Sequence, residues 1–568
     1  MTARFGAPAR ALTAPAYALA LAIAVTAPLF APGYLLLRDA VSTPRSYLSD
    51  AALGLTEAAP RALPQDFFVA VVSAVVDGGV VVKVLLVAGL WAAGAGAARL
   101  AADVLGCGPA GQCLAVTVAV WNPYVAERLL QGHWSLLVGY GCLPWVAAAM
   151  LRLRGSAGSA PMWALLFWMA LAGLTPTGLL LAATVALACV FAPGAGRARW
   201  VCATLSMGIA VLVALPWLVA AAVAGSLSSS QAAGADAFAA RAEPGLGTLF
   251  SLAGLGGIWN GEAVPTTRTT VFAVVATVVL LAVVALGLPV LIRHPAAVPL
   301  LVLAIVAVVV PAAMATGPGL ALVEATIRTL PGLGVVRDAQ KWVALAMPGY
   351  ALAAAAAVLT LRRWLPAAAA AVLCCVALIA TLPDLAWGVG GKVVAVQYPP
   401  GWASVAALVN ADPRPVAVLP AESMRRFGWA GDAPVLDPLP RWVRADVLST
   451  GDLNIGGQTV PGEGERARKV QDMLLRGASR DELAQAGVGW VVVESGPPAA
   501  SLELPVAYQD SSLTLYRVGG DRQQASGRGL VLAAHLAWLA ALFAGLTGMV
   551  VARLRRAHRP RGYTTPLT

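Results

Sequence analysis

The chain has 568 residues, of which 59% are hydrophobic and only 12% are charged, and its mean hydropathy is +0.77. Soluble globular domains carry about 25% charged residues, so this composition excludes an ordinary soluble protein and predicts a polytopic membrane protein. The net charge of +11 does not indicate nucleic-acid binding, because the Arg residues are scattered between apolar segments and form no single basic patch.

Nine apolar runs are long enough to cross a bilayer as a helix, which takes roughly 17–25 residues. They lie near residues 13–36, 79–98, 134–151, 199–223, 269–292, 296–315, 342–361, 365–383 and 529–552. Three shorter runs, at 107–121, 161–175 and 177–193, bring the expected number of transmembrane helices to about twelve. The first run is too long for a signal-peptide core, so we expect it to stay as an anchor.

Basic residues occur in every second connection between these runs. They are Arg4, Arg10, Arg99, Arg152, Arg154, Arg197, Arg199, Arg293, Arg362, Arg363, Arg553, Arg555, Arg556, Arg559 and Arg561. Connections rich in Arg and Lys face the cytoplasm. We therefore expect both termini in the cytoplasm and the connections near 37–67, 121–134, 175–178, 224–268 and 316–341 on the outer face of the plasma membrane.

Hydropathy falls and charges return between about residues 387 and 528. Residues 416–419, 490–494 and 513–517 have the pattern of short β-strands, and residues 465–475 and 480–486 have that of helices. The sequence therefore predicts a multispanning domain over 1–386 and a small extracytoplasmic α/β domain over 387–528. A final transmembrane helix with a basic cytoplasmic tail follows over 529–568.

Two isolated carboxylates stand out in the first outer connection. Asp39 lies about where the first span leaves the membrane, and its side chain is either a solvated carboxylate paired with Arg38 or a general base for an acceptor hydroxyl. Asp66 either caps the apolar helix that follows it or belongs to a site. Asp50 and Glu57 are expected to be solvated surface charges.

The connection at 121–134 gathers many chemically able side chains in a short stretch. Glu127, Gln131 and Trp134 lie at helical spacing, and Arg128 and His133 lie between them. One interpretation is a Glu127–Arg128 surface pair beside an interfacial Trp. The other is a binding site in which Arg128 holds a phosphate bidentately.

A third polar stretch precedes the span near 342–361. Arg337 and Lys341 lie four residues apart, on one helical face, with Asp338 between them. Their side chains either snorkel to lipid headgroups or form a cationic seat for a phosphate at the outer interface.

Familiar soluble-enzyme and metal motifs do not occur in the sequence. The seven Cys residues lie within or beside apolar runs and show no metal-ligand spacing. No P-loop, GxSxG, HExxH or paired-Cys motif is present.

Three stretches resemble the GT-C-type glycosyltransferases, multispanning enzymes that use polyprenyl-phosphate-linked sugars on the outer face of the membrane. They are Leu37-Arg-Asp39-Ala-Val with Pro60-Arg-Ala-Leu-Pro-Gln-Asp66, the whole of Trp121–Trp134, and Val336-Arg-Asp-Ala-Gln-Lys341. The likeness covers roughly residues 10–390. It is closest to the membrane portion of the arabinofuranosyltransferases of cell-wall arabinan, and looser to the YfhO-like membrane proteins.

The resemblance implies a transferase that moves a sugar of the arabinofuranose or mannose class from a polyprenyl-phosphate donor to an envelope glycan or lipid acceptor. In this family an acidic residue of the first outer loop activates the acceptor hydroxyl, and Asp39 matches that position. Many relatives carry adjacent acidic pairs, whereas this chain has isolated ones, so Asp39 and Asp66 both stay candidate catalytic residues. No cofactor is implied, and nothing in the sequence requires a divalent metal, although some relatives use one.

The substrate-binding candidates come from the second and third stretches. Arg128, Arg337 or Lys341 would hold the donor phosphate, and His133 or Glu127 would contact the sugar or position Arg128. The full set is Glu127, Arg128, Gln131, His133, Trp134, Arg337, Asp338 and Lys341.

Two other classes of protein fit the many spans. A transporter or flippase of a lipid-linked or polar substrate predicts ionisable residues deep within spans and an inverted repeat. Asp77 and Lys83 come nearest to this, and no repeat is visible. A non-catalytic scaffold for envelope assembly would use 387–528 to bind a partner.

Overall fold

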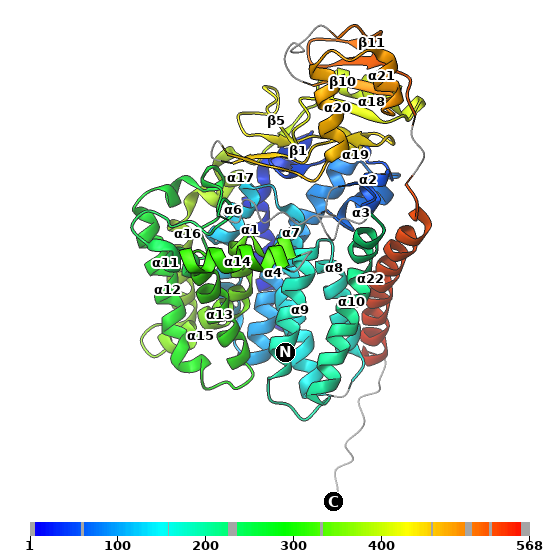
Figure 1. Cartoon of the computed structure of the whole chain (residues 1–568). Helices are drawn as coiled ribbons and strands as arrows, with labels where there is room; N and C mark the ends of the chain where they lie inside the picture. Colours follow the sequence, from blue (N-terminus) through cyan, green and yellow to red (C-terminus); the bar gives the residue numbers. More distant parts are fainter. Residues whose placement is uncertain are drawn as a thin grey trace, which may run out of the picture.

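The computed structural model describes residues 6–57, 62–156, 158–224, 236–329, 333–455, 458–494, 502–521 and 525–557. A bundle of helices carries an α/β unit on one of its ends (Figure 1). Arg4, Arg559 and Arg561, used for the topology prediction, lie outside the described residues, as do Pro60 and Arg61 of the first resemblance motif.

Each of the twelve apolar runs forms one helix of the bundle. These helices are α1 (Gly6–Thr26), α4 (Gly78–Leu105), α5 (Pro109–Val120), α7 (Trp134–Gly155), α8 (Ala160–Ala172), α9 (Pro176–Val190), α10 (Arg199–Ala224), α12 (Phe272–Leu291), α13 (Val298–Met314), α15 (Met347–Leu361), α16 (Ala367–Ala380) and α22 (Arg528–Ala557).

Among the described residues, seven helices are long and apolar enough to cross a membrane, and nine if each of two bent pairs is one span. The bent pairs are α13 with α14 (Gly317–Thr329), at 91°, and α16 with the segment Pro383–Gly391, at 75°. A bilayer core is about 30 Å thick, and α9, with 15 residues, is about 22 Å long at 1.5 Å per residue. The prediction of a polytopic membrane protein is confirmed, whereas the count of about twelve spans stays a prediction.

Small residues let the helices of the bundle approach closely. Gly141 of α7 faces the backbone of Gly89 on α4, and Gly287 of α12 faces the backbone of Ala353 on α15, with no room for a Cβ at Gly141 or Gly287. Helices packed in lipid use such contacts because no hydrophobic effect drives them together.

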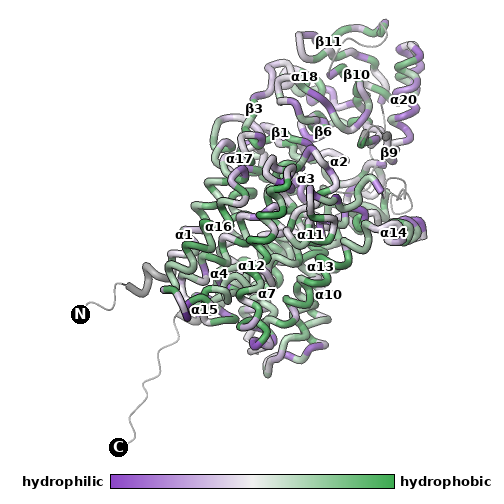
Figure 2. The backbone as a smooth tube through the Cα atoms, turned by 90° about the vertical axis from the view of Figure 1, so that its left-hand side faces the viewer, coloured by the Kyte–Doolittle hydropathy of each residue, from purple (hydrophilic) through white to green (hydrophobic). Residues whose placement is uncertain are grey.

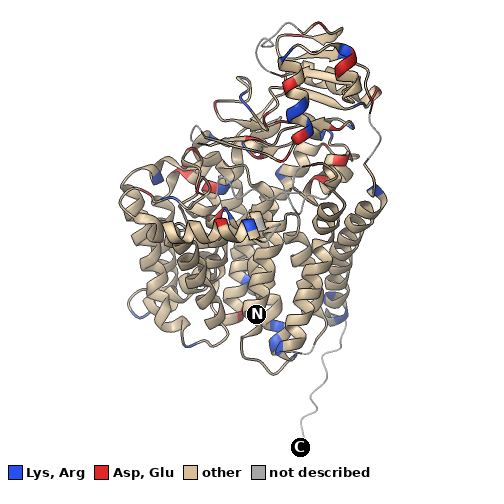
Figure 3. Cartoon of the chain, viewed as in Figure 1, with Lys and Arg blue, Asp and Glu red and all other residues tan. Residues whose placement is uncertain are grey.

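Apolar and charged residues are separated along the bundle. The helices are mostly hydrophobic along their length (Figure 2). Lys, Arg, Asp and Glu gather in the α/β unit and near the ends of the bundle (Figure 3). Val275, Ile305 and Val372 of α12, α13 and α16 are at least half exposed, as expected for side chains that face lipid. Which end faces the cytoplasm stays a prediction.

The α/β unit is built on a five-stranded sheet in the order β11-β12-β10-β4-β7. Strand β4 pairs in parallel with β7 and β10, and β12 pairs antiparallel with β10 and β11. The strands are β4 (Val416–Leu419), β7 (Val447–Leu448), β10 (Trp490–Val493), β11 (Val506–Gln509) and β12 (Thr514–Arg517); the helices are α18 (Pro400–Ala411), α19 (Leu439–Trp442), α20 (Glu465–Leu475) and α21 (Arg480–Gln485). The unit also contains two antiparallel strand pairs, β5 (Met424–Arg425) with β6 (Val435–Leu436) and β8 (Leu453–Ile455) with β9 (Gln458–Val460). The strands and helices expected between 416 and 517 therefore form, although the boundaries 387 and 528 stay a prediction.

The connection at residues 37–67 is tied to the α/β unit by backbone hydrogen bonds. Strand β1 (Tyr34–Leu37) pairs with β2 (Ala40–Val41) on one side and with β3 (Ala395–Val396) on the other. The β5–β6 hairpin continues this contact, because the Arg38 N–H donates to the Pro434 carbonyl and the Leu436 N–H donates to the Arg38 carbonyl, both at 2.8 Å. Two short helices, α2 (Asp50–Leu53) and α3 (Gln65–Val72), complete the connection.

Candidate active site

The three polar stretches meet where the bundle joins the α/β unit. Asp39 lies in the turn between β1 and β2, and α6 (Pro123–Leu130) carries the second stretch. This helix begins where the Asn122 side chain accepts a hydrogen bond from the Val125 N–H at 3.1 Å, with Pro123 in its first turn. Asp338 precedes the 3₁₀ helix η6 (Ala339–Ala346).

Asp39 accepts two hydrogen bonds from the second stretch. Gln131 Nε2 and His133 Nε2 each lie 3.0 Å from Asp39 Oδ2. The Asp39 N–H also donates to the Gln131 carbonyl at 3.2 Å. The Asp39 side chain is 39% exposed, so its carboxylate is fixed in place and still open to solvent. The guanidinium of Arg38 donates its hydrogen bonds to the carbonyls of Leu130 and Glu262 instead, so Gln131 and His133 are what hold the Asp39 side chain.

The tautomer of His133 follows from its two neighbours. Arg128 Nη1 lies 3.1 Å from His133 Nδ1, and a guanidinium can only donate. His133 Nδ1 is therefore the acceptor, and Nε2–H donates to Asp39 in a neutral imidazole. Burial lowers the pKa of His133, and the Asp39 hydrogen bond offsets only part of that effect. Burial alone would raise the pKa of Asp39, but the hydrogen bonds from His133 and Gln131 bring it below its ordinary value.

Arg128 is fully buried and bound to Asp338. Arg128 Nη1 and Nη2 donate to the two Asp338 oxygens at 2.8 and 3.0 Å, and Arg128 Nη2 also donates to Gln340 Oε1. The ring of Tyr124 lies 5.5 Å from the guanidinium carbon. Lys341 Nζ lies 3.6 Å from Asp338. Both terminal nitrogens of this buried side chain are therefore committed to protein groups, which corrects the expectation that Arg128 binds a phosphate bidentately.

Glu127 is also buried, so the interpretation of Glu127 and Arg128 as a surface pair is wrong. Its carboxylate accepts hydrogen bonds from the N–H groups of Gly257 and Ile258, both at 3.1 Å, and from Gln340 Nε2 at 3.0 Å. The glutamate thus anchors α6 to the loop after α11 (Gly247–Ala253) and to η6. Its side chain is inaccessible to solvent.

Arg38 holds the turn in a conformation that is unusual for a residue with a side chain. Its φ is +48°, which costs an L-residue about 1–2 kcal/mol. Arg38 Nη1 donates to the Leu130 carbonyl at 2.6 Å and Nη2 donates to the Glu262 carbonyl at 2.9 Å. Together with the two bonds to the β5–β6 hairpin, these contacts set the direction of Asp39.

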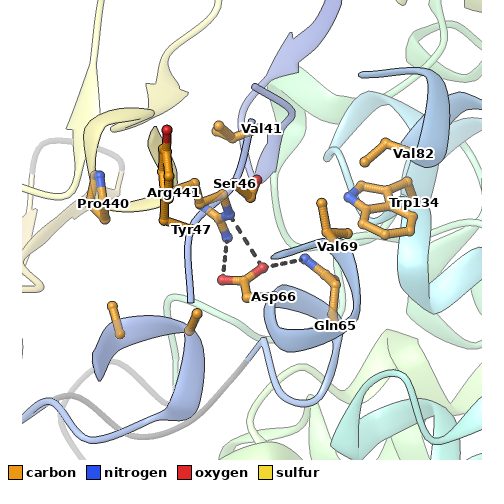
Figure 4. Close-up of a pocket in the computed structure, with 12 residues that line it drawn as sticks. Val41, Ser46, Tyr47, Gln65, Asp66, Val69, Val82, Trp134, Pro440 and Arg441 are labelled. Atoms are coloured by element: carbon orange, nitrogen blue, oxygen red, sulfur yellow. Dashed lines mark hydrogen bonds and ion pairs between the residues drawn. The ribbon is translucent and has the colours of Figure 1, made fainter. Parts of the chain in front are cut away.

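Asp66 lies elsewhere, in a pocket at the domain junction (Figure 4). Its carboxylate pairs with Arg441 of α19, with Nη2 at 3.2 Å from Oδ2. It does not cap α3, because Pro64 occupies the N-cap position and Asp66 lies in the first turn. Trp134 lines the same pocket. Asp50 and Glu57 also have partners, since Arg528 pairs with Asp50 and the Arg466 N–H donates to Glu57.

Arg337 and Lys341 do not share a helical face. Arg337 precedes η6, and its guanidinium carbon lies 5.1 Å from the ring of Phe238, whereas Lys341 contacts Asp338 and is 23% exposed. The structure therefore brings six predicted residues into one cluster: Asp39, Arg128, Gln131, His133, Asp338 and Lys341. It adds two that the sequence analysis missed, Gln340 and Asn260, whose Nδ2 donates to Gln131 Oε1 at 2.8 Å. Gln340 lay within the third resemblance motif, while nothing in the local pattern marked Asn260.

Within the described ranges, no group of three or more His, Cys, Asp and Glu side chains is placed to hold a metal ion. The cluster offers a partly exposed carboxylate, a neutral imidazole and, behind them, a buried guanidinium–carboxylate pair. Such an arrangement is suited to accepting a proton from a hydroxyl group at Asp39.

The apolar helices of the bundle define this chain as a multispanning membrane protein. No protein-family model matches the sequence, and no curated protein matches it. Three solved structures share the fold, all of arabinofuranosyltransferase AftD from mycobacteria. One superposes with a TM-score of 0.55 at 17% identity, over 90% of this chain and 40% of that chain. Two structures of an AftD mutant give 0.53 at 18% identity and 0.52 at 16%, and each is covered over 42% of its length. This chain thus spans well under half of AftD.

Proposed function

We propose that the chain is a membrane glycosyltransferase that moves a sugar from a polyprenyl-phosphate donor to an envelope glycan or lipid acceptor on the outer face of the plasma membrane. The observation that carries the proposal is Asp39, held by His133 and Gln131 and 39% exposed. The fold shared with AftD supports it. The sugar is of the arabinofuranose or mannose class.

Asp39 is the general base of the proposed reaction. The acceptor oxygen attacks the anomeric carbon while Asp39 takes the hydroxyl proton. The bond between that carbon and the phosphate oxygen breaks, and its electron pair leaves with the polyprenyl phosphate. Since the leaving group is already an anion of low basicity, it needs little acid catalysis, and nearby positive charge stabilises it. Lys341, charged and 23% exposed beside the cluster, is the residue we assign to that role.

His133 and Arg128 act through Asp39. A neutral His133 donates to Asp39 and so favours the ionised form of the base. Arg128 keeps His133 in that tautomer, and Asp338 keeps Arg128 in place through a bidentate contact. These are positioning residues, because none of them touches the reacting atoms.

The test is a transfer assay on membranes that contain the full chain, with radiolabelled polyprenyl-phosphate arabinofuranose and polyprenyl-phosphate mannose as donors. We expect transfer from one donor, and its loss in Asp39→Asn. Asp50→Asn is the matched control, since Asp50 pairs with Arg528 and lies outside the cluster. If Asp39→Asn transfers at the wild-type rate, the site assignment is wrong. If neither donor supports transfer, the proposal fails and a flippase or a scaffold replaces it.

A further inference from the structure

The pocket that holds Asp66 lies where the bundle meets the α/β unit, and its volume is about 40 Å³. Gln65 and Asp66 of α3 line it from the bundle, as does Trp134 at the start of α7. Arg441 lines it from the α/β unit (Figure 4). Tyr47, from the first outer connection, forms a further wall. The pocket is thus made by both parts of the molecule.

The charges in this pocket are already balanced. Arg441 Nη2 lies 3.2 Å from Asp66 Oδ2 and Arg441 Nε lies 3.3 Å from Asp66 Oδ1, while Gln65 Nε2 donates to the same Oδ1 at 3.1 Å. The side chains of Asp66 and Arg441 are 18% and 14% exposed. A phosphate would be repelled by Asp66, and a cation by Arg441. A neutral ligand that both donates and accepts hydrogen bonds fits the pair.

The remaining walls and the volume narrow the class of ligand. The indole of Trp134 and the ring of Tyr47 supply apolar surface beside the polar groups, a combination typical of small-molecule sites. A water molecule needs about 10–15 Å³ of such space, so the pocket admits a few hydroxyl-sized groups. That matches the edge of one sugar ring better than a whole oligosaccharide.

The pocket is next to the proposed base. Val41 lines it and follows Asp39 by two residues, and two residues of extended chain span at most about 7 Å. Trp134 lines it and directly follows His133. The pocket is therefore lined by residues that follow Asp39 and His133 closely along the chain.

We infer that this pocket is the acceptor subsite, in which Asp66 and Arg441 bind hydroxyl groups of the acceptor sugar. The inference rests on the proposed function, and it gives the α/β unit a direct part in choosing the acceptor. Asp66 is then a binding residue, and proton transfer stays with Asp39.

The first test measures steady-state kinetics of the full chain in nanodiscs, with synthetic arabinofuranose and mannose oligosaccharides as acceptors. Asp66→Asn and Arg441→Gln are each expected to raise the acceptor KM about 10- to 100-fold, because each removes hydrogen bonds to a charged group. The donor KM and kcat should change less than about twofold. Arg468→Gln is the control, since it breaks another Arg–Asp pair of the α/β unit, with Asp452 at 2.8 Å. An unchanged acceptor KM, or a fall in kcat alone, overturns the inference.

Two further measurements separate binding from a mere link between domains. Exchanging the charges, as Asp66→Arg with Arg441→Asp, restores an ion pair but not the position of each group around a sugar. We expect the acceptor KM to stay high, and recovery of the wild-type KM would make the pair a structural link and overturn the inference. Direct binding of the same oligosaccharides needs no transfer activity. If the wild type transfers no sugar but binds an oligosaccharide and Arg441→Gln does not, only the proposed function fails. If the wild type binds none, the subsite fails too.

Discussion

Two buried arginine–carboxylate pairs lie close together in this protein and differ in what surrounds them. Arg128 with Asp338 and Arg268 with Glu243 are both almost wholly inaccessible to solvent. Arg268 Nη1 also donates to the Ala273 carbonyl and to Thr277 Oγ1, both at 3.2 Å. The further hydrogen bonds of the Arg268 guanidinium thus go to residues close to it in the sequence. Arg128 instead continues through His133 to a carboxylate that is 39% exposed. A buried ion pair thus points to a site when hydrogen bonds connect it to an accessible group, and to fold stability when they do not.

The strongest test of this difference is at Asp39, the exposed end of the hydrogen-bonded series Arg128–His133–Asp39. Asp39→Asn should lower the transfer rate by about 10²–10⁴-fold, because a general base contributes about that much. Its thermal unfolding should stay close to that of the wild type, since Asn keeps the size of a partly exposed side chain. Initial rates per amount of folded protein measure the first effect, and a thermal scan measures the second. Loss of folded protein in this variant would contradict the assignment.

The Arg268–Glu243 pair should affect stability and leave the transfer rate unchanged. Arg268→Met leaves Glu243 buried without its partner and should lower the free energy of unfolding by about 3–5 kcal/mol. Thermal denaturation in detergent checks this, and the double variant Arg268→Met with Glu243→Leu should recover much of the loss. The protein that stays folded should transfer sugar at the wild-type rate. A rate defect in folded protein would erase the contrast with Arg128.

His133 links the buried Arg128 to the partly exposed Asp39. The variant His133→Ala should slow transfer about tenfold. The hydrogen bond from His133 is the largest contribution that lowers the pKa of Asp39 below its ordinary value of 3.8, whereas burial raises it. The base works in its ionised form, so in the wild type the acid limb of kcat/KM lies below that pH. Removing His133 should move the acid limb to higher pH. A pH profile of kcat/KM measures the shift, and an unmoved limb would separate His133 from Asp39.

The smallest expected effect concerns the turn that aims Asp39. Arg38→Ala loses the side-chain bonds to Leu130 and Glu262 and still has to adopt a positive φ, whereas Arg38→Gly adopts it without strain. We expect the Gly variant to be about fivefold more active than the Ala variant, which corresponds to about 1 kcal/mol, the lower end of the cost of the backbone strain. Comparing kcat of the two variants measures this. Equal rates would show that the positive φ at residue 38 does not limit the reaction.

Local patterns predicted the helices, the main strands of the α/β unit, and the stretches from which the cluster is drawn. They failed for partners that come from distant parts of the chain. Arg128 meets Asp338 across 210 residues, and Glu127 meets Gly257 across 130. A Glu–Arg neighbour pair in a short loop has the pattern of a solvated surface. Its burial depends on donors and acceptors that only the folded chain supplies. The pairing of Asp66 with Arg441, across 375 residues, was hidden for the same reason.

Gly132 sets the spacing between the segment that carries Asp39 and the segment that carries Gln131 and His133. Its φ is +83°, and a Cβ there would collide with the Leu37 carbonyl and the Ala40 nitrogen. The distance from Asp39 to Gln131 and His133 is thus fixed by main-chain contact, and side chains lining the neighbouring pocket have little part in it. In the proposed reaction this arrangement separates two kinds of change during evolution. Residues around the proposed acceptor subsite could be exchanged to admit a new sugar while the geometry around the proposed base, Asp39, is inherited unaltered.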